Sequence, residues 1–358
     1  MERFCCTTQV VAGDGALAAL RDMGIGRLLV VTDPYFMKNG TAERIAGLSG
    51  APQVAYFDEV TPDPSVELVA RGTSQVKTFE PDTILALGGG SAMDCAKAMG
   101  YFSGVPVVAV PTTSGSGSEV TDFAILTHDR VKHPLVDEKL RPKAAILDPA
   151  LLESLPESLI ADAGFDVLSH ALEAYVAKNA GAITDALARD AFCTAFGALP
   201  ASFGGNRSVR GRIHTAATMA GIAFNQAGLG LCHAMSHSLG GLFHVPHGRL
   251  NAILLPEVIT CNGYTVAEKY ARLARSAGLG GAADTLALRN LKNALIRLRR
   301  ELKLPATLAQ AGIDPAQVRR NRAQIVEAAL KDPCCATNPI TVEPFMVHRI
   351  LEEVTGRV

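Results

Sequence analysis

The chain has 358 residues, of which 48% are hydrophobic and 19% are charged, and its 34 basic and 35 acidic residues leave a formal net charge of −1 at pH 7. This length suits two globular domains, and the interspersed charges exclude the one-sided basic surface of a nucleic-acid-binding protein. No apolar run reaches the length of a membrane span, the eight cysteines form no C-x-x-C pair, and no signal peptide is recognised. We therefore expect a reduced, soluble, cytoplasmic protein that binds neither nucleic acid nor membrane.

Short β-branched runs punctuated by Gly, Pro and Asp dominate the chain up to about residue 149. The predicted strands cover residues 27–33, 53–60, 82–91, 105–113 and 143–149. Helical stretches such as 65–79 and 91–102 separate several of them, and the N-terminal MERFCCTTQVV also has the pattern of a strand. Strands that alternate with helices predict a mostly parallel, doubly wound, Rossmann-like sheet.

After Leu151 the pattern changes, and apolar residues recur every three to four positions, which is typical of amphipathic helices. We therefore predict two domains. Residues 1–152 form a nucleotide-binding α/β domain, and residues 153–358 form an all-helical domain.

Two glycine-rich loops compete for the role of binding a cofactor phosphate. GDGALA at residues 13–18 has Asp33 18 residues after Gly15, which fits a dinucleotide-binding fingerprint. LALGGGSAMDCAKAM at residues 85–99 instead runs from a buried strand through three glycines into a helix predicted to start at Ser91. The free N–H groups of such a helix start bind a pyrophosphate, although a capping box between Ser91 and Asp94 explains the same residues without a ligand.

A third loop, PTTSGSGSE at residues 111–119, follows the next predicted strand and is rich in hydroxyl groups. Two neighbouring strands that each end in such a loop predict a crevice at the carboxyl edge of the sheet. We therefore expect a nucleotide to bind there.

In the helical half, residues 165–178 place three polar side chains on one helix face: Asp166, His170 and Glu173. Taken alone, an ordinary solvated face explains this spacing. Residues 232–248 add a second polar group, four of the nine histidines of the chain: His233, His237, His244 and His247. A helix that begins near Leu229 places the first two of these histidines on one face.

Gly240 and Gly241 are expected to end that helix, and Pro246 should hold Val245 extended so that His247 follows in a loop. One aspartate with two or three histidines from separate elements is a suitable donor set for iron or zinc. The spacing leaves open whether His233 or His237 is the ligand.

Taken together, these motifs resemble the iron-containing (group III) alcohol dehydrogenases over nearly the whole chain. The resemblance rests on VVTDPYF, GGGSAMDCAKA, PTTSGSGSEVT, FDVLSHALEAY, NQAGLGLCHAMSHSLGGLFHVPHG and DPCCATNP, in this order. The histidine-rich segment is most similar to the propanol and ethanol dehydrogenases of bacterial microcompartments. The resemblance implies the two-domain architecture of the dehydroquinate synthase-like proteins.

The resemblance also implies a role for individual residues. The implied metal ligands are Asp166, His170, His233 and His247, which makes His237 a neighbour of the metal that assists proton movement. The implied cofactor-binding residues are Asp33, Asp63, Gly89, Gly90, Ser91, Asp94, Thr112, Thr113, Ser116 and Lys132. GDGALA becomes an ordinary helix start, while the carboxylate of Asp33 favours NAD over NADP.

The implied activity is an NAD(H)- and Fe²⁺-dependent alcohol dehydrogenase, with Zn²⁺ as a substitute metal and a hydride transferred in a cleft between the domains. Because Phe123, Ala124, Phe165 and Leu229 bring no cation near the expected ligands, we predict short aliphatic substrates such as 1-propanol or ethanol. A hydroxy acid such as 4-hydroxybutyrate, a dehydroquinate synthase-like lyase and a metallohydrolase are the alternatives. The family implies at least a homodimer. The resemblance to microcompartment enzymes leaves open a location inside a bacterial microcompartment within the cytoplasm, and the strand-like N-terminus does not decide it.

Overall fold

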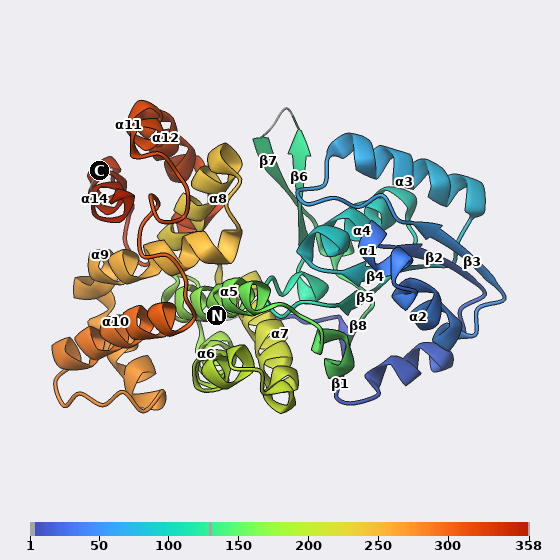
Figure 1. Ribbon diagram of the computed structural model, residues 1–358, viewed down its shortest axis with the longest axis horizontal. Coiled ribbons are helices and arrows are strands. Elements are labelled where there is room, and N and C mark those ends of the chain that lie inside the picture. Colours follow the sequence, from blue (N-terminus) through green and yellow to red (C-terminus); the bar gives the residue numbers. More distant parts are fainter. Residues whose placement is uncertain (1–3, 129–130, 357–358) are drawn as a thin grey trace. The chain divides into compact units, whose positions relative to one another are not determined.

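The computed structural model describes residues 4–128 and 131–356, and its contacts divide the chain into two units. The N-terminal unit is Cys5–Leu155, and the C-terminal unit begins at Pro156 and also includes Phe4. The predicted boundary between residues 152 and 153 lies close to this division. The predicted combination of an α/β half with a helical half is confirmed (Figure 1).

A parallel six-stranded sheet forms the centre of the N-terminal unit, with the strand order β1-β8-β5-β4-β2-β3. The strands are β1 (Gln9–Ala12), β2 (Arg27–Val31), β3 (Gln53–Phe57), β4 (Thr83–Gly88), β5 (Val107–Pro111) and β8 (Ala144–Leu147). All five runs predicted as strands are in the sheet, although each strand ends before the last residues of its predicted run. The carboxyl ends of β2, β4 and β5 therefore carry Asp33 and the two glycine- and hydroxyl-rich loops.

Helices cover both faces of this sheet (Figure 1). They are η1 (Ala16–Met23), α1 (Pro34–Lys38), α2 (Thr41–Ser49), α3 (Val66–Phe79) and α4 (Gly90–Ser103), with short 3-10 turns η2 (Ser118–Val120), η3 (Glu138–Leu140) and η4 (Pro149–Leu152). Alternate strand residues face opposite sides: Leu29 and Val31 pack in one core with α3 and α4, whereas Leu28 and Val30 pack in the other with η1 and α2.

An antiparallel hairpin that the sequence analysis did not predict follows the third loop. It pairs β6 (Phe123–His128) with β7 (Val131–Val136). Pro134 and His133 lie within β7, and a proline interrupts the pattern of a strand because it has no N–H to donate to a neighbour. This composition concealed the hairpin.

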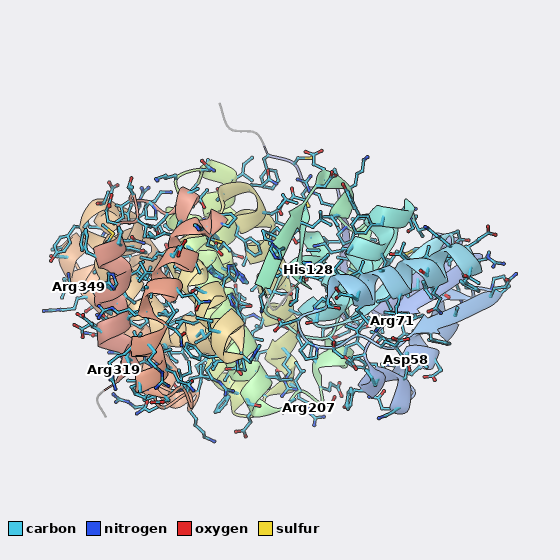
Figure 2. All side chains as sticks on the ribbon, turned by 90° about the horizontal axis from the view of Figure 1, so that it is seen from above. Asp58, Arg71, His128, Arg207, Arg319 and Arg349 are labelled. Atoms are coloured by element: carbon cyan, nitrogen blue, oxygen red, sulfur yellow. The ribbon has the colours of Figure 1, made fainter. Side chains whose placement is uncertain are left out.

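Within its described residues, the C-terminal unit is built of helices joined by loops and contains no strand. Its helices are α5 (Glu157–Val176), α6 (Ala182–Phe203), η5 (Arg207–Val209), α7 (Arg210–Ala227), α8 (Leu231–Phe243), α9 (His247–Ser276), α10 (Asp284–Glu301), α11 (Pro315–Arg320), α12 (Arg322–Lys331), α13 (Pro333–Thr337) and α14 (Pro344–Thr355). None of these described helices combines the length and the apolar composition needed to cross a membrane. Charged side chains such as Arg71, Arg207 and Arg319 lie at the periphery of the units (Figure 2).

The structure excludes one alternative about the helical unit and contradicts two local expectations. The polar face of α5 is not a solvated surface, because α6, α7 and α9 pack against this helix and Asp166, His170 and Glu173 are all buried. Helix α8 continues through Gly240 and Gly241 to Phe243, and His244 ends it in the left-handed conformation with a φ of 54°. His247 is not in a loop, since it is the first residue of α9.

Gly248 allows the start of α9 to approach α5 at unusually short range. A Cβ atom at this position would lie 1.9 Å from the backbone oxygen of Asp162 and 3.2 Å from the Cβ of Asp166. A backbone oxygen cannot move aside as a flexible side chain does. Any larger residue must therefore push the two helices apart, together with His247, which directly precedes the glycine.

We predict that Gly248→Ala lowers the free energy of unfolding by about 1–3 kcal/mol, the usual penalty for overpacking a core. Gly241→Ala is the matched control, because Gly241 also lies within a helix but a Cβ there meets nothing within 4 Å. The control substitution should be neutral or stabilise by up to about 1 kcal/mol through helix propensity. Thermal unfolding of the two variants checks this, and equal shifts in melting temperature would contradict the close packing.

Candidate metal and nucleotide sites

Three side chains from three helices of the C-terminal unit point their donor atoms at one another. They are Asp166 of α5, His233 of α8 and His247 of α9, and one ligand atom of each lies within 4.8 Å of the others. The Oδ1 atom of Asp166 is 3.9 Å from Nε2 of His233 and 3.8 Å from Nε2 of His247. Imidazole nitrogens and a carboxylate at such separations form a suitable donor set for iron or zinc.

His170, the fourth residue that the resemblance implied, lies beside this group. Its Nδ1 atom is 3.9 Å from Oδ2 of Asp166. Its ring stacks against those of Phe224 and His233, with ring centroids 4.4 and 4.5 Å apart. The three-donor group does not include it, so its role as a ligand stays a prediction.

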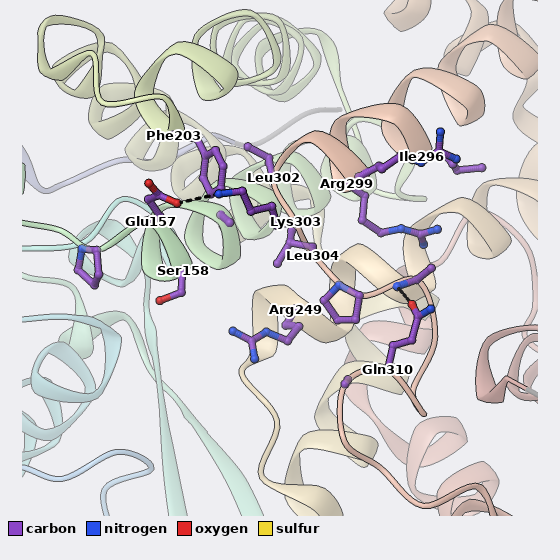
Figure 3. A pocket seen from close by; sticks show the side chains of 16 residues that line it. Glu157, Ser158, Phe203, Arg249, Ile296, Arg299, Leu302, Lys303, Leu304 and Gln310 are labelled. Carbon is purple, nitrogen blue, oxygen red and sulfur yellow. Dashed lines mark hydrogen bonds and ion pairs between the residues drawn. The ribbon is translucent and has the colours of Figure 1, made fainter. Parts of the chain in front are cut away.

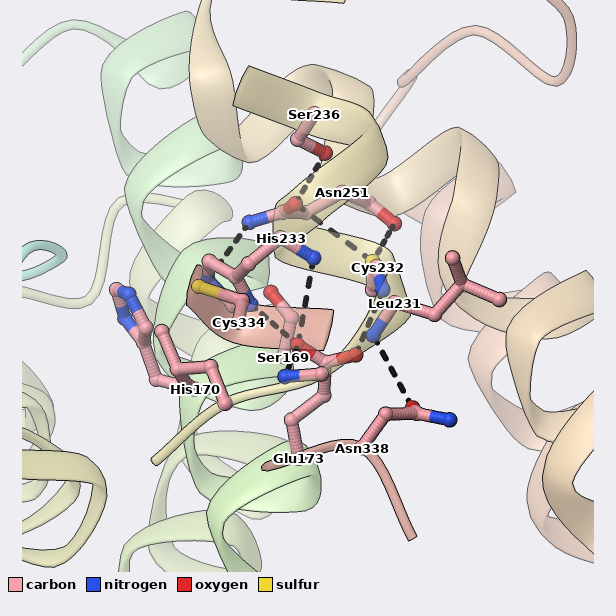
Figure 4. Close-up of polar contacts among 12 residues, drawn as sticks. Ser169, His170, Glu173, Leu231, Cys232, His233, Ser236, Asn251, Cys334 and Asn338 are labelled. Carbon is pink, nitrogen blue, oxygen red and sulfur yellow. Dashed lines mark hydrogen bonds and ion pairs between the residues drawn. The ribbon is translucent and has the colours of Figure 1, made fainter. Parts of the chain in front are cut away.

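Glu173, one further helical turn along α5, holds His233 in place (Figure 4). Its carboxylate accepts the backbone N–H groups of Gly230, Cys232 and His233 at 3.0, 2.7 and 3.3 Å. The same carboxylate lies 2.6 Å from Nδ1 of the His233 ring. A proton held on Nδ1 by this contact places the ring lone pair on Nε2, on the side of Asp166.

Burial shapes the protonation of these groups. It raises the pKa of the Asp166 carboxyl, and it raises the pKa of Glu173 to about 7, even though three N–H groups stabilise the Glu173 carboxylate. Burial also lowers the pKa of His233 well below its usual value, so the imidazole is neutral, as a metal ligand must be. A divalent cation would supply the positive charge that the buried Asp166 lacks, and the donor set therefore fits a metal ion.

Asn251, one helical turn after His247 on α9, fixes the aspartate. Its Nδ2 group donates to Oδ1 of Asp166 at 2.8 Å, while its Oδ1 atom accepts the hydroxyl of Ser236. The sequence analysis missed this residue because an asparagine inside a helix has no distinctive pattern. The only hint in the sequence was that Asn251 follows His247 by four residues, which places both on the same face of a helix.

His237 lies beside the three-donor group rather than in it. Its ring stacks on that of His247 with centroids 5.0 Å apart, and its Nδ1 atom is 2.8 Å from Oδ2 of Asp332. Asp332 caps α13 by accepting the N–H of Cys334. His244, the remaining histidine of the segment, is exposed.

In the N-terminal unit the two loops after β4 and β5 are in contact. A Cβ on Gly89 would lie 3.3 Å from Oγ1 of Thr113, and one on Gly90 would lie 3.2 Å from Cβ of Ser116. The backbone N–H of Thr112 donates to the carbonyl of Gly88 at 2.9 Å. A Cβ at either glycine would therefore force the facing side chains of Thr113 and Ser116 to shift by a few tenths of an ångström.

The structure rules out the capping box that was the alternative explanation of the first loop. Helix α4 begins at Gly90 with Gly89 as its N-cap, one residue before the predicted start at Ser91. Asp94 instead accepts the hydroxyl of Ser118 at 2.6 Å and the N–H of Ile125 at 3.1 Å. The start of α4 therefore has no capping side chain, which suits a helix terminus that binds an anion.

The remaining predicted cofactor residues lie around the same edge. Asp33, at the end of β2, caps α1 by accepting the N–H groups of Tyr35 and Phe36, and its Oδ2 atom lies 3.9 Å from a Cβ built on Gly88. Asp63 has a positive φ of 55° and forms an ion pair of 2.7 Å with Lys132 of β7. GDGALA leads into the 3-10 helix η1, with Gly15 as N-cap, as the resemblance implied.

Lys97 of α4, which the sequence analysis did not select, is almost completely buried beneath the third loop. Its ammonium group donates to the carbonyl of Ser118, to the hydroxyl groups of Ser118 and Thr121, and to the carbonyl of Phe123. Burial lowers its pKa to about 8. A lysine on a helix is usually solvated, so nothing in the local sequence indicated that this one anchors the loop.

A large cavity of about 930 Å³ lies elsewhere in the C-terminal unit, between the start of α5 and the end of α10 (Figure 3). The described residues that line it include Arg249 and Arg299 but none of the metal-ligand candidates. The volume of a cavity alone therefore does not identify the candidate metal site in this protein.

Comparison with known proteins gives consistent matches over the whole chain. A family model described as iron-containing alcohol dehydrogenase matches residues 7–149, and the C-terminal model of the same family matches residues 160–355. A 1-propanol dehydrogenase from Citrobacter freundii is 40% identical, with 99% of this chain and 100% of the relative covered. An NADPH-dependent butanol dehydrogenase from Clostridium saccharobutylicum is 35% identical, with 98% of this chain and 97% of the relative covered.

Solved structures agree with these matches. The iron-containing alcohol dehydrogenase from Thermococcus thioreducens has a TM-score of 0.91 and 32% identity, with 98% of this chain and 99% of that chain covered. A 1,3-propanediol oxidoreductase has a TM-score of 0.94 and 31% identity, with 99% and 100% covered.

The buried Lys97 generates a pH prediction. The unfolded chain keeps the lysine protonated up to the ordinary lysine pKa of 10.5, whereas the folded chain releases the proton above about pH 8. The unfolded state therefore binds more protons in this window, so the Lys97 contribution to the free energy of unfolding should rise with pH, by up to about 3 kcal/mol. Urea titrations of the wild type and Lys97→Met between pH 7.5 and 10.5 give the free energy of unfolding of each protein at each pH. The difference between the two plots against pH is the Lys97 contribution. Parallel curves would show that Lys97 does not titrate in this range.

Proposed function

This chain belongs to the iron-containing alcohol dehydrogenase family, and from that premise we propose that it interconverts short aliphatic alcohols and aldehydes with NAD(H). Membership in the family makes it an oxidoreductase and implies iron and NAD(P) as cofactors. The single observation that best supports the site is the convergence of Asp166, His233 and His247 from three helices. The glycine- and hydroxyl-rich loops at the carboxyl edge of the N-terminal sheet support the binding of the nucleotide.

Asp166, His233 and His247 would hold Fe²⁺, with Zn²⁺ as a substitute, and His170 is the proposed fourth ligand beside them. A bound ion supplies Lewis-acid polarisation of a carbonyl or hydroxyl oxygen, and the nicotinamide supplies or accepts the hydride. The surrounding residues orient the donors. Glu173 holds the proton of His233 on Nδ1, and Asn251 holds the carboxylate of Asp166.

His237 is the proposed proton carrier. Asp332 occupies its Nδ1 side at 2.8 Å and fixes the ring against His247. Nε2 is the ring atom that remains to take or give a proton. The side chain of His237 is 29% exposed, so the proton has a path to water.

The proposed binding of NAD(H) uses the start of α4 for the pyrophosphate. The peptide N–H groups at Gly90 and Ser91 belong to the first turn of this helix, where an anion is favoured. Thr112, Thr113 and Ser116 of the facing loop, with Asp94, Asp63 and Lys132, are the other proposed contacts. Asp33 distinguishes the nucleotides, because its carboxylate would accept a ribose hydroxyl and repel a 2′-phosphate.

A neutral substrate suits the charges around the metal residues. Arg249, two residues after His247, is the nearest cation in the sequence, but its guanidinium is engaged by both carboxylate oxygens of Asp162, at 3.1 and 2.8 Å. An acidic substrate would have to break this pair. Two of the four apolar residues expected around the metal ligands, Ala124 and Phe165, are fully buried. The 1-propanol and butanol dehydrogenases among the relatives favour short aliphatic substrates.

Iron should restore activity to the stripped protein. We expect anaerobic, metal-free protein to leave NADH unchanged with propionaldehyde, and added Fe²⁺ to start oxidation of NADH, measured by absorbance. Asp166→Asn is the matched control, since it keeps the side-chain volume but loses the charged donor, and it should stay inactive after the same addition. If NADH binds but is not oxidised in the iron-loaded wild type, short aldehydes are not substrates.

Removing the charge of Asp33 should relax the preference for NADH. The variant Asp33→Asn can still accept the helix-capping N–H groups, because an asparagine side chain caps as well as an aspartate does. We expect the kcat/KM for NADPH relative to NADH to rise about tenfold or more as a like-charge repulsion disappears. Steady-state kinetics with both nucleotides measures this, and an unchanged melting temperature shows that the cap is intact. An unchanged ratio would assign the discrimination to other residues.

A further inference from the structure

A second group of mixed donors lies next to the proposed iron site. It consists of His237 on α8 with Asp332 and Cys334 at the start of α13, and one ligand atom of each lies within 4.8 Å of the others. All three residues are half-buried. Asp332 links the other two, since Oδ2 lies 2.8 Å from Nδ1 of His237 and Oδ1 accepts the N–H of Cys334.

We propose that His237, Asp332 and Cys334 form a second, separate cation site that selects a borderline or soft divalent ion such as Zn²⁺, Co²⁺ or Cd²⁺. The donor types decide this choice. A nitrogen, a carboxylate oxygen and a sulfur suit zinc-like ions, whereas Mg²⁺ and Ca²⁺ take oxygen ligands. The group around Asp166 offers nitrogen and oxygen donors only, so the thiol distinguishes the two sites.

The geometry needs only small side-chain adjustments. A tetrahedral zinc ion with bonds of about 2.0–2.3 Å separates its ligand atoms by roughly 3.3–3.8 Å. The distance between His237 and Asp332, now 2.8 Å, must therefore lengthen slightly. The longer distances among the three donor atoms, which are at most 4.8 Å, must shorten. Asp332 and Cys334 lie at the N-cap and in the first turn of a helix only five residues long.

Binding exchanges a proton for the ion. The Cys334 thiol loses its proton to solvent and binds as a thiolate, while the imidazole of His237 binds as a neutral ring that keeps its proton on the nitrogen facing away from the ion. Burial beside Asp332 raises the pKa of the Cys334 thiol well above its usual value. The thiol is therefore protonated until an ion displaces the proton, and occupancy should increase with pH.

The second site has a functional consequence, which rests on the proposed function, although the site itself does not. An ion held by His237 takes this imidazole out of proton transfer. The iron ligands Asp166, His233 and His247 keep their own positions. Zinc at the second site would thus inhibit turnover without removing iron.

Cys335 provides a matched control for the test. It is the direct neighbour of Cys334 and is also half-buried. Its Sγ atom donates to the backbone carbonyl of Ala329 at 3.0 Å rather than joining the donor group. A non-specific thiol effect should affect both cysteines, whereas the proposed site needs only Cys334.

The experiment titrates Co²⁺ into anaerobic, iron-loaded protein and follows the near-ultraviolet absorption that arises when a thiolate binds Co²⁺. We expect the wild type and Cys335→Ala to bind one equivalent of cobalt with this band, while the iron content stays constant. Cys334→Ala should lose the band and bind cobalt about tenfold more weakly or worse. Asp332→Asn, a second variant that keeps the side-chain volume, should keep the thiol but weaken cobalt binding.

Three outcomes would overturn the proposal: a band that survives in Cys334→Ala, a band that disappears in Cys335→Ala, or cobalt uptake that matches a loss of iron. Circular dichroism of each variant confirms folding before the titration. Turnover is measured separately, and there Zn²⁺ should inhibit the wild type but not Cys334→Ala. Because the optical result needs no turnover, failure of the alcohol dehydrogenase proposal and failure of the second site are distinguishable.

Discussion

The buried carboxylate of Glu173 organises the helical unit around its reactive centre. It accepts three backbone N–H groups at the start of α8 and the ring of His233, so one side chain both anchors a helix terminus and orients a metal-ligand candidate. Asn338 supports the same terminus by accepting the N–H of Leu231 at 3.1 Å. Removal of the carboxylate would leave these buried donors unsatisfied, which is costly because no water replaces the lost partner.

The N-terminal unit also has a buried charged side chain that holds backbone segments in place, but here the charge is positive. The ammonium group of Lys97, buried beneath the hydroxyl-rich loop, ties Ser118 and Thr121 to α4. Glycines at positions 89 and 90 let the same loop lie against the start of that helix. A rigid pair of loops is the form of support that a bound cofactor needs, since flexible loops would have to be ordered upon binding.

Residues whose role depends on local pattern could be predicted from the sequence. The β-branched runs indicated five of the sheet strands, and the glycine loop and the histidine-rich segment indicated both candidate sites. Spacing left open whether His233 or His237 is a ligand, and only the resemblance to a family selected His233. Residues whose role depends on a partner far away in the sequence could not be predicted. Glu173 meets His233 60 residues away, Asp166 meets Asn251 85 residues away, and His237 meets Asp332 95 residues away. Periodicity showed that one face of α5 is polar, but it could not show that this face is buried against other helices. The role of His170 as a ligand and the nucleotide contacts stay predictions.

Because His247 is the first residue of α9, an ion at the proposed site would link metal supply to the folding of the chain. The three candidate donors belong to three helices and are far apart in sequence, so an ion that joins them acts as a cross-link within the helical unit. A ligand that binds only the folded form stabilises it in proportion to the logarithm of its free concentration. An ion bound at the proposed site would therefore also make the folded protein more resistant to proteolysis.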